Sequence, residues 1–348
     1  MGYGIRLGED RFYRLFASCQ LCGLPVLGVS GNETHGTERK SGRLTKTHYR
    51  EVLSVPLIQV NGVDIHYHMQ GKGTPIVFLH PPCIGSRVFT YMRNDLSQDH
   101  KTVLFDFRGH GRSGSSHAPI TIPLLAEDVR QLMDRLDISK AYLCCYSMSS
   151  VVALQALLSY PDRFLGGIFL GGTAELTGWK SRAKLKAGVW AGKMRAREII
   201  SIPLAWVNAD NRETFHRIRG ETRSGDIENW RQYMESGLAY SAVNRLKDIH
   251  QPMLLLCGQK DKEFKGYMKV LQNGLANFSS AYIPGLKHTL PIDGAEPIGD
   301  LVRGWLNAQK RQREDFQPAA MREERQQVAF TALPSDQQDL DAQEPYYH

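Results

Sequence analysis

Three serines stand within four residues of the stretch AYLCCYSMSS (141–150), where an apolar run typical of a buried strand meets a run with helical composition. A strand that turns sharply into a helix crowds its own backbone, so the residues two before and two after the apex must be small. Ser147 meets this condition because Cys145 and Ser149 flank it, whereas the other two serines have β-branched valines at that spacing. Ser147 is therefore the candidate nucleophile, next to a helix N-terminus that favours negative charge.

A serine hydroxyl is a weak nucleophile until a base takes its proton, and that base needs an acid partner. Asp261 follows the apolar strand-like run at 253–257, and His288 follows the last such run. Either residue alone is unremarkable in a polar loop. In the chain order Ser147, Asp261, His288, each just beyond a predicted strand, they form a candidate catalytic triad.

Several other residues compete for chemical roles. Glu175 is the alternative acid, and Glu263 is a weaker one because it lies further into its loop. His80 and His110 are expected to be structural, His80 as a brace directly after a strand and His110 in a glycine-flanked turn. The CxxC pair at 19–22 has no second pair and no clustered histidines, so no metal or redox site is expected there.

Strand-like and helix-like segments alternate from about residue 56 to residue 308. The first such segment, 57–69, alternates in polarity and carries the hairpin signal Asn61-Gly62. The later strands are short continuous apolar runs, which indicate a parallel sheet covered on both faces. The sequence therefore predicts an α/β fold with a mostly parallel, doubly wound sheet.

Three segments give the chain a resemblance to the α/β-hydrolase family. CYSMS around Ser147 resembles the nucleophile turn of that family, with Cys145 and Ser149 in place of the usual glycines. The segment 106–113, DFRGHGRS, resembles the D-x-R-G-x-G-x-S segment, and His80-Pro-Pro stands where the family often has an H-G loop. The resemblance implies the α/β-hydrolase fold, in its serine-hydrolase branch of esterases, lactonases and haloperoxidases.

This resemblance also implies an oxyanion hole, which needs two N–H donors aimed at the developing charge. One donor is expected from Met148, the residue after the nucleophile. The family position of the second donor is occupied by Pro82, which has no N–H. HPPCIGS is one residue longer than the common form of this loop, so Cys83 is the candidate second donor.

A Ser-His-Asp site with an oxyanion hole performs acyl transfer through an acyl-enzyme. The expected function is cleavage of a carboxylic ester or lactone of a small to medium hydrophobic substrate. An acyltransferase, a cofactor-free haloperoxidase or a carbon–carbon bond hydrolase uses the same triad, and these alternatives stay open. A non-catalytic ligand-binding scaffold on the same fold is a further alternative, favoured by the departures at Pro82 and Ser149.

Composition divides the chain into a domain and two ends. Residues 1–54 and 309–348 are polar or lack periodicity and are predicted to be disordered extensions of a domain at 55–308. An insert at about 175–246, rich in tryptophan and lysine, is expected to form a small helical cap. Within it, residues 180–197 carry seven basic side chains and no acid, which indicates a solvated amphipathic helix or a surface that attracts anionic substrates or lipid head groups.

The totals are those of an ordinary globular protein: 348 residues, 42% hydrophobic, with a net charge of +7. No apolar run reaches the roughly 18 residues of a membrane helix, so stable membrane insertion is not expected. No nucleotide, flavin, metal or nucleic-acid motif is found, and no cofactor is expected. A cytoplasmic location is expected, and the sequence leaves the oligomeric state open.

Overall fold

The structure is a computed structural model that describes residues 56–315. The predicted disordered extension over residues 1–54, its CxxC pair, and the chain from residue 316 onward lie outside the described residues. Within residues 56–315, no helix is long and apolar enough to span a bilayer.

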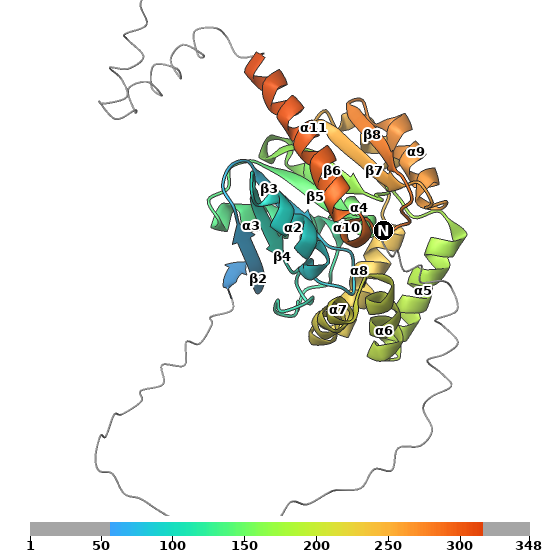
Figure 1. The fold of residues 1–348 in the computed structure, drawn as a ribbon. Helices are drawn as coiled ribbons and strands as arrows, with labels where there is room; N and C mark the ends of the chain where they lie inside the picture. The colour runs from blue at the N-terminus through green and yellow to red at the C-terminus, as the bar shows by residue number, and fades with distance from the viewer. Residues whose placement is uncertain (1–55, 316–348) are drawn as a thin grey trace, which may run out of the picture. The chain divides into compact units, whose positions relative to one another are not determined.

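In this part of the chain, eight strands form one sheet in the order β1-β2-β4-β3-β5-β6-β7-β8 (Figure 1). β2 pairs antiparallel with β1 and with β4, and each other neighbouring pair is parallel. The strands are β1 (Leu57–Val60), β2 (Val63–Gln70), β3 (Pro75–Leu79), β4 (Lys101–Phe105), β5 (Ala141–Tyr146), β6 (Phe164–Leu170), β7 (Met253–Gly258) and β8 (Phe278–Ile283).

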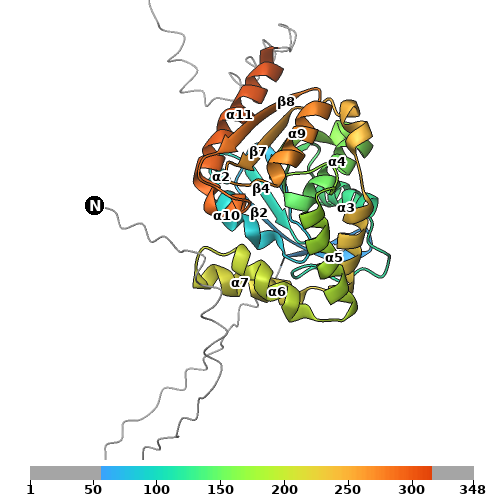
Figure 2. The ribbon, with the colours of Figure 1, turned by 90° about the vertical axis from the view of Figure 1, so that its right-hand side faces the viewer.

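Helices cover both faces of this sheet (Figures 1 and 2). The helices outside the insert are α2 (Thr90–Leu96), α3 (Ile122–Arg135), α4 (Ser150–Ser159), α9 (Phe264–Gly274), α10 (Leu290–Asp293) and α11 (Ala295–Asp315). Short 3₁₀ turns are η1 (Ser86–Phe89), η2 (Ser147–Ser149), η3 (Pro161–Arg163) and η4 (Val243–Asp248). The predicted doubly wound, mostly parallel α/β fold is confirmed.

Alternation along the central strands explains the two layers. In β3, Val77 and Leu79 pack with α3, α4 and α9, whereas Ile76 and Phe78 pack with α2 and α11. All four side chains are fully buried, because each face of a parallel sheet needs its own apolar set under its own helices. This is why the central strands read as continuous apolar runs rather than as alternating ones.

The hairpin at the edge of the sheet forms where the sequence predicts it. Asn61 and Gly62 both have positive φ values, 47° and 79°, and join β1 to β2 directly after the pair Val60–Val63. A two-residue turn of this kind matches the right-handed twist of its strands, and Asn-Gly adopts it at low cost.

The insert between β6 and β7 contains four helices in the described chain: α5 (Trp179–Lys193), α6 (Arg197–Val207), α7 (Arg212–Ser224) and α8 (Ile227–Ala239). Its two ends meet, because Glu175 forms a bridge with Ser241 and the Ala242 N–H donates to the Ala174 carbonyl at 3.0 Å. The insert therefore leaves the sheet and returns to it at one place.

The predicted end of the domain at residue 308 is too early, since α11 continues to Asp315. The apolar face of α11 that packs on the sheet ends near Leu306. The predicted domain end at residue 308 followed the end of this apolar pattern. Beyond that point, the Arg313 guanidinium donates to the Tyr142 hydroxyl at 2.8 Å and lies over its ring. A cation anchored on an aromatic ring thus holds the last turns without an apolar pattern.

Candidate active site

Ser147 stands at the apex of the turn between β5 and α4. Its φ is +57°, in the left-handed region that a residue other than glycine adopts only under constraint. The fully buried strand β5 ends at Tyr146, and η2 begins at Ser147 and leads into α4. This is the strained strand-to-helix turn that exposes a serine hydroxyl above a parallel sheet.

The other two serines of this segment have structural contacts. The Ser149 hydroxyl accepts from the Tyr146 N–H at 3.0 Å and lies 2.5 Å from the Leu79 carbonyl at the end of β3. The Ser150 hydroxyl accepts from the Thr173 N–H and lies 2.8 Å from the Thr173 carbonyl. Both hydroxyls therefore tie the turn to neighbouring strand ends, and Ser149 does so at a position where the family usually has glycine.

His288 brings the three predicted triad residues together. Its Nε2 lies 2.9 Å from the Ser147 Oγ, and its Nδ1 lies 2.8 Å from the Asp261 Oδ2. A carboxylate can only accept a hydrogen bond, so Nδ1 carries the proton and the Nε2 lone pair faces the serine hydroxyl. In this tautomer His288 is set to accept a proton from Ser147.

Two aromatic rings fix the plane of the imidazole. Phe264 stacks on His288 with ring centroids 3.9 Å apart, and Tyr146 lies at 5.2 Å on a tilted plane. Gly171, with φ +58°, leaves the room that the ring needs, since a Cβ there would lie 2.9 Å from the His288 Cε1. Sequence reasoning missed these residues, although Phe264 stands only three positions after Asp261.

Asp261 is anchored and ionised at its place in the loop after β7. Its side chain is 8% exposed, and its Oδ1 accepts from the Phe264 N–H at 3.1 Å. Burial raises the pKa of Asp261, but the hydrogen bond and charge of His288 and the backbone N–H donors outweigh this effect and lower that pKa overall. The carboxylate is therefore suited to orient His288 and to stabilise its protonated form.

The two alternative acids lie in other hydrogen-bond networks. The Glu263 Oε1 accepts from the Ser181 N–H at 2.8 Å and from its hydroxyl, at the start of α5. Glu175 pairs through its backbone with Ser241. Among the described residues, neither carboxylate makes a hydrogen bond or ion pair with His288.

The two predicted oxyanion donors lie under the same helix. Cys83, in the loop after β3, has a φ of +72°, and its Sγ lies 3.8 Å from the Met234 Sδ of α8. A Cβ at Gly237, one turn further along α8, would lie 2.7 Å from the Met148 Cε. Met148 is the second residue of η2, where backbone N–H groups have no partner within the helix. Helix α8 thus covers both segments next to Ser147.

His80 and His110 are buried and hold backbone segments, as the sequence led us to expect. The His80 Nε2 accepts from the Phe107 N–H at 2.9 Å, while its Nδ1 bonds to the Pro81 carbonyl. The His110 Nδ1 bonds to the Arg108 carbonyl at 3.0 Å. Burial lowers the pKa of both imidazoles, that of His110 to about 3, so both are neutral at physiological pH.

Two buried carboxylates support the loop that follows β4. Asp106 accepts from the His66 Nδ1 at 2.8 Å and from the backbone N–H groups of Ser86 and Arg112. Asp128, on α3, forms a two-pronged ion pair with Arg108 at 2.5 and 2.6 Å, with side chains 1% and 3% exposed. Neither carboxylate touches the Ser147–His288–Asp261 group, so both serve the scaffold that positions it.

Replacing Asp128 by alanine should destabilise the fold by about 3–5 kcal/mol, because the buried Arg108 guanidinium would lose the one carboxylate that it pairs with among residues 56–315. Thermal or urea unfolding of the purified variant measures this loss. Asp134→Ala on the same helix removes two ion pairs of a 44% exposed side chain, with Arg130 and Arg163, and should cost at most about 1–2 kcal/mol. Equal losses in the two variants would contradict a structural role specific to the buried pair.

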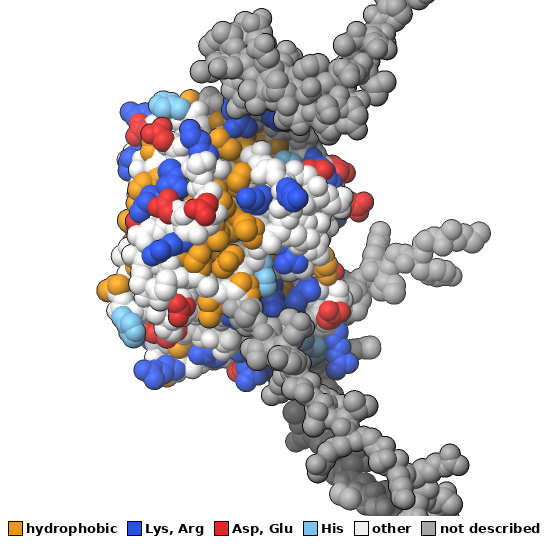
Figure 3. Space-filling model, turned by 90° about the vertical axis from the view of Figure 1, so that its left-hand side faces the viewer, with side chains coloured by type: hydrophobic (Ala, Val, Ile, Leu, Met, Phe, Trp, Pro, Cys, Tyr) orange, Lys and Arg blue, Asp and Glu red, His pale blue; other side chains and the backbone are white. Residues whose placement is uncertain are grey.

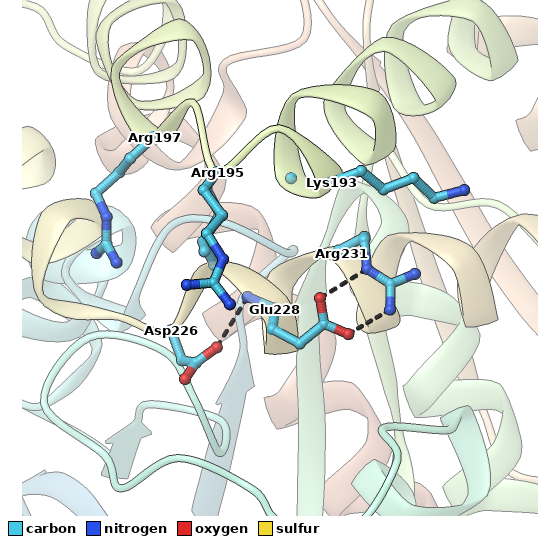
Figure 4. A pocket seen from close by; sticks show the side chains of 8 residues that line it. Lys193, Arg195, Arg197, Asp226, Glu228 and Arg231 are labelled. Atoms are coloured by element: carbon cyan, nitrogen blue, oxygen red, sulfur yellow. Dashed lines mark hydrogen bonds and ion pairs between the residues drawn. The ribbon is translucent and has the colours of Figure 1, made fainter.

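An open hollow of about 700 Å³ lies at the far end of the insert (Figure 4). Two of its cations have close partners: Arg231 bonds to Glu228 and Glu235, and Arg197 donates to the Gly225 carbonyl at 2.6 Å. The lining residues are Gly192, Lys193, Arg195, Arg197, Asp226, Ile227, Glu228 and Arg231. None of the predicted triad or oxyanion residues lines this hollow, and within residues 56–315 no group of His, Cys, Asp and Glu is arranged to hold a metal ion.

The chain is similar in sequence and in fold to several known proteins. The chain is 24% identical over 261 residues to a protein named "Putative carbamate hydrolase RutD" of Azorhizobium caulinodans, an alignment covering 72% of this chain and 98% of that protein. Among solved structures, an esterase from Thermogutta terrifontis is similar with a TM-score of 0.66 at 19% identity, covering 73% of this chain and 99% of the esterase. The enol-lactonase of Burkholderia xenovorans has a TM-score of 0.65 at 20% identity, covering 72% of this chain and all of the lactonase.

Both solved structures share the fold of this chain. A family model also matches most of the residues that the structure describes. Residues 74–285 match the model of the alpha/beta hydrolase fold. The matched region contains Ser147 and Asp261, and His288 stands three residues beyond its end. The chain therefore belongs to the alpha/beta hydrolase fold family.

Proposed function

We propose that the protein is a serine hydrolase that cleaves a carboxylic ester or lactone of a small to medium hydrophobic substrate. The observation that carries this proposal is the hydrogen-bonded chain from Asp261 through His288 to a serine held at positive φ. A serine hydroxyl with a base and an acid in this order performs acyl transfer.

The reaction runs in two halves on the same residues. The Ser147 Oγ attacks the carbonyl carbon while His288 Nε2 takes its proton, and Asp261 stabilises the imidazolium. His288 then returns the proton to the leaving alkoxide, which departs as the alcohol and leaves an acyl-serine. Water attacks this ester with His288 again as base, and the acid and free serine are released.

The developing oxyanion needs two donors in a site from which water is excluded. We assign them to the backbone N–H groups of Met148 and Cys83, since Pro82 has none. Cys83 has no hydrogen-bond partner for its N–H among the described residues. Its left-handed backbone is a local strain of the kind that gathers at functional sites.

Apolar groups around the nucleophile support a hydrophobic acyl or alcohol part. Met148 lies against α8, and from α8 itself Tyr233 and Met234 are buried toward the loop after β3. The names of two similar structures, an esterase and an enol-lactonase, denote the same bond class.

Hydrolysis of p-nitrophenyl esters of increasing chain length tests this proposal. The purified full chain should release p-nitrophenol with saturation kinetics, with the highest kcat/KM at a short or medium acyl chain. Ser159→Ala, on the exposed end of α4, should keep the wild-type rate. A rate no higher than that of the unfolded protein, with every ester, would contradict the proposed function.

A further inference from the structure

The first two helices of the insert expose large apolar side chains to solvent. In the part of the chain that the structure describes, twelve large hydrophobic side chains are exposed, and seven of them lie within residues 179–207. These seven are Trp179, Trp190, Met194, Ile199, Ile202, Trp206 and Val207. Apolar surface gathered on one segment indicates an interaction surface, whereas single exposed apolar residues do not.

On α5 the exposed residues form one stripe. Trp179, Ala183, Trp190 and Met194 are separated by intervals of four, seven and four residues, which places them on one side of a helix. Trp179 is 75% exposed and Trp190 59% exposed. Leu185 packs inward against the core instead. The stripe thus faces away from the molecule, with a tryptophan in the first turn and another in the last.

Lysines border this stripe on both sides. At 100° per residue, Lys186 and Lys193 lie along one edge of the stripe and Lys180 and Lys184 along the other. All four lysines are exposed, and α5 contains no acidic residue. An apolar stripe between lysines suits a helix that lies on a membrane surface, with the stripe among acyl chains and the lysines at the phosphates.

The positive charge of α5 is mostly uncompensated. Lys184 and Lys193 lie 3.9 and 4.0 Å from carboxylates of Glu263 and Glu235, and exposed pairs at such distances contribute little. Within residues 56–315, no carboxylate lies within 4.0 Å of the Lys180 or Lys186 ammonium groups. On the other side of the molecule, at the sheet edge beside β2, hydrophobic side chains lie among charges of both signs (Figure 3).

Helix α6 continues the apolar surface after a tight turn. Its outward residues Ile199, Ile202, Pro203, Trp206 and Val207 recur at helical spacing and include no charge. Its inward residues Ile200 and Ala205 are buried in the insert and against the body of the protein. The turn at 194–196 joins α5 to α6, and both helices lie on the outside of the molecule (Figure 2).

We propose that this α5–α6 surface, made of the seven apolar residues above and Lys180, Lys184, Lys186 and Lys193, docks on a bilayer that contains anionic phospholipid. Tryptophan is favoured at the boundary between acyl chains and head groups, and each lysine near an anionic surface adds about 1 kcal/mol of attraction. A second copy of the chain is a poorer partner, because a two-fold contact would set the same lysines against each other.

The surface also borders the proposed active site. Glu263, two residues after Asp261, holds the first turn of α5 through Ser181. Along its inner side α5 packs on α8, where a Cβ at Gly188 would lie 2.8 Å from the Met234 Sδ. Docking through α5 would therefore bring the segments around Ser147 close to the lipid surface.

Co-sedimentation of the full chain with vesicles tests this inference. The protein should bind to vesicles of phosphatidylcholine that contain phosphatidylglycerol, and much more weakly to vesicles of phosphatidylcholine alone. On binding, its tryptophan emission should shift to the blue. The double variant Lys180→Glu/Lys186→Glu should bind at least about tenfold more weakly. Trp190→Ala should also weaken binding and reduce the spectral shift.

The matched control is Lys140→Glu/Lys269→Glu, which makes the same charge change at two exposed lysines outside the insert and should bind as the wild type does. Equal weakening in both double variants, equal binding to the two kinds of vesicle, or no binding would overturn the inference. Self-association that Trp190→Ala abolishes, without vesicle binding, would overturn it in favour of a second copy. Ser147→Ala should bind like the wild type, so this test stands apart from that of hydrolysis.

Discussion

Ser147→Ala is expected to lower kcat/KM for the preferred p-nitrophenyl ester by about 10³-fold or more. The proposed attacking atom is lost, while substrate binding and the proposed oxyanion donors are kept. The substitution removes one hydroxyl whose partner is the His288 Nε2. It leaves the contacts of Ser149 and Ser150 that hold the turn. Steady-state rates of purified wild type and variant give the ratio.

Unfolding of the same variant provides the control. Ser147→Ala should melt within a few degrees of the wild type, because only one partly exposed hydrogen bond is lost. Alanine, like serine, has a β-carbon, so the strain of the left-handed backbone at this position is unchanged. A variant that is folded and retains more than about a tenth of the wild-type rate would contradict a nucleophilic role of Ser147.

Asp261→Asn is the second substitution with a large expected effect, a loss of about 10³–10⁴-fold in kcat. The asparagine amide can donate to Nδ1, which moves the imidazole proton to Nε2 and turns it toward the serine. His288 then can no longer accept the Ser147 proton, although the side chains keep nearly the same positions. The measurement is kcat at saturating ester.

Glu263→Gln is the matched control, since Glu263 follows two residues later in the same loop and was the weaker alternative acid. Its carboxylate accepts from Ser181, and an amide oxygen can keep at least one of these bonds. Its kcat should stay within about tenfold of the wild type. A severe loss in Glu263→Gln, with Asp261→Asn active, would assign the acid to Glu263 instead.

The sheet and the meeting of Ser147, Asp261 and His288 could be predicted because both depend on local patterns. Continuous apolar runs separated by helical spacing identify parallel strands, and the carboxyl ends of such strands lie along one edge of the sheet. Ser147, Asp261 and His288 each follow a strand at that edge, so their positions after the strand ends place them on the same side of the sheet. Small neighbours at 145 and 149 selected Ser147 from three serines.

Features that depend on tertiary contacts could not be predicted in the same way. The end of α11 depends on Arg313 reaching Tyr142, a contact across 171 positions of the chain. The stacking of Phe264 on His288 likewise joins two loops. Small residues were expected at 145 and 149 for steric reasons alone. In the structure the Ser149 hydroxyl also makes hydrogen bonds that a glycine could not make.

In the insert, the spacing of apolar residues predicts a helix but not which side of it is buried. Leu185, Val189, Trp190 and Met194 fall near helical spacing and could be assigned to one buried face. In the structure Leu185 and Val189 turn inward, while Trp190 and Met194 are exposed. Spacing shows that a helix has an apolar side, but the partner of that side is fixed by the elements around it.

Treating the purified protein with a fluorophosphonate and locating the adduct by peptide mass would show directly whether Ser147 is the nucleophile. We expect one phosphonyl group on Ser147 and none on Ser149 or Ser150, with no labelling after Ser147→Ala or after unfolding. An adduct on another residue, or a folded protein that stays unlabelled while binding an ester without turnover, would contradict it and favour a ligand-binding scaffold.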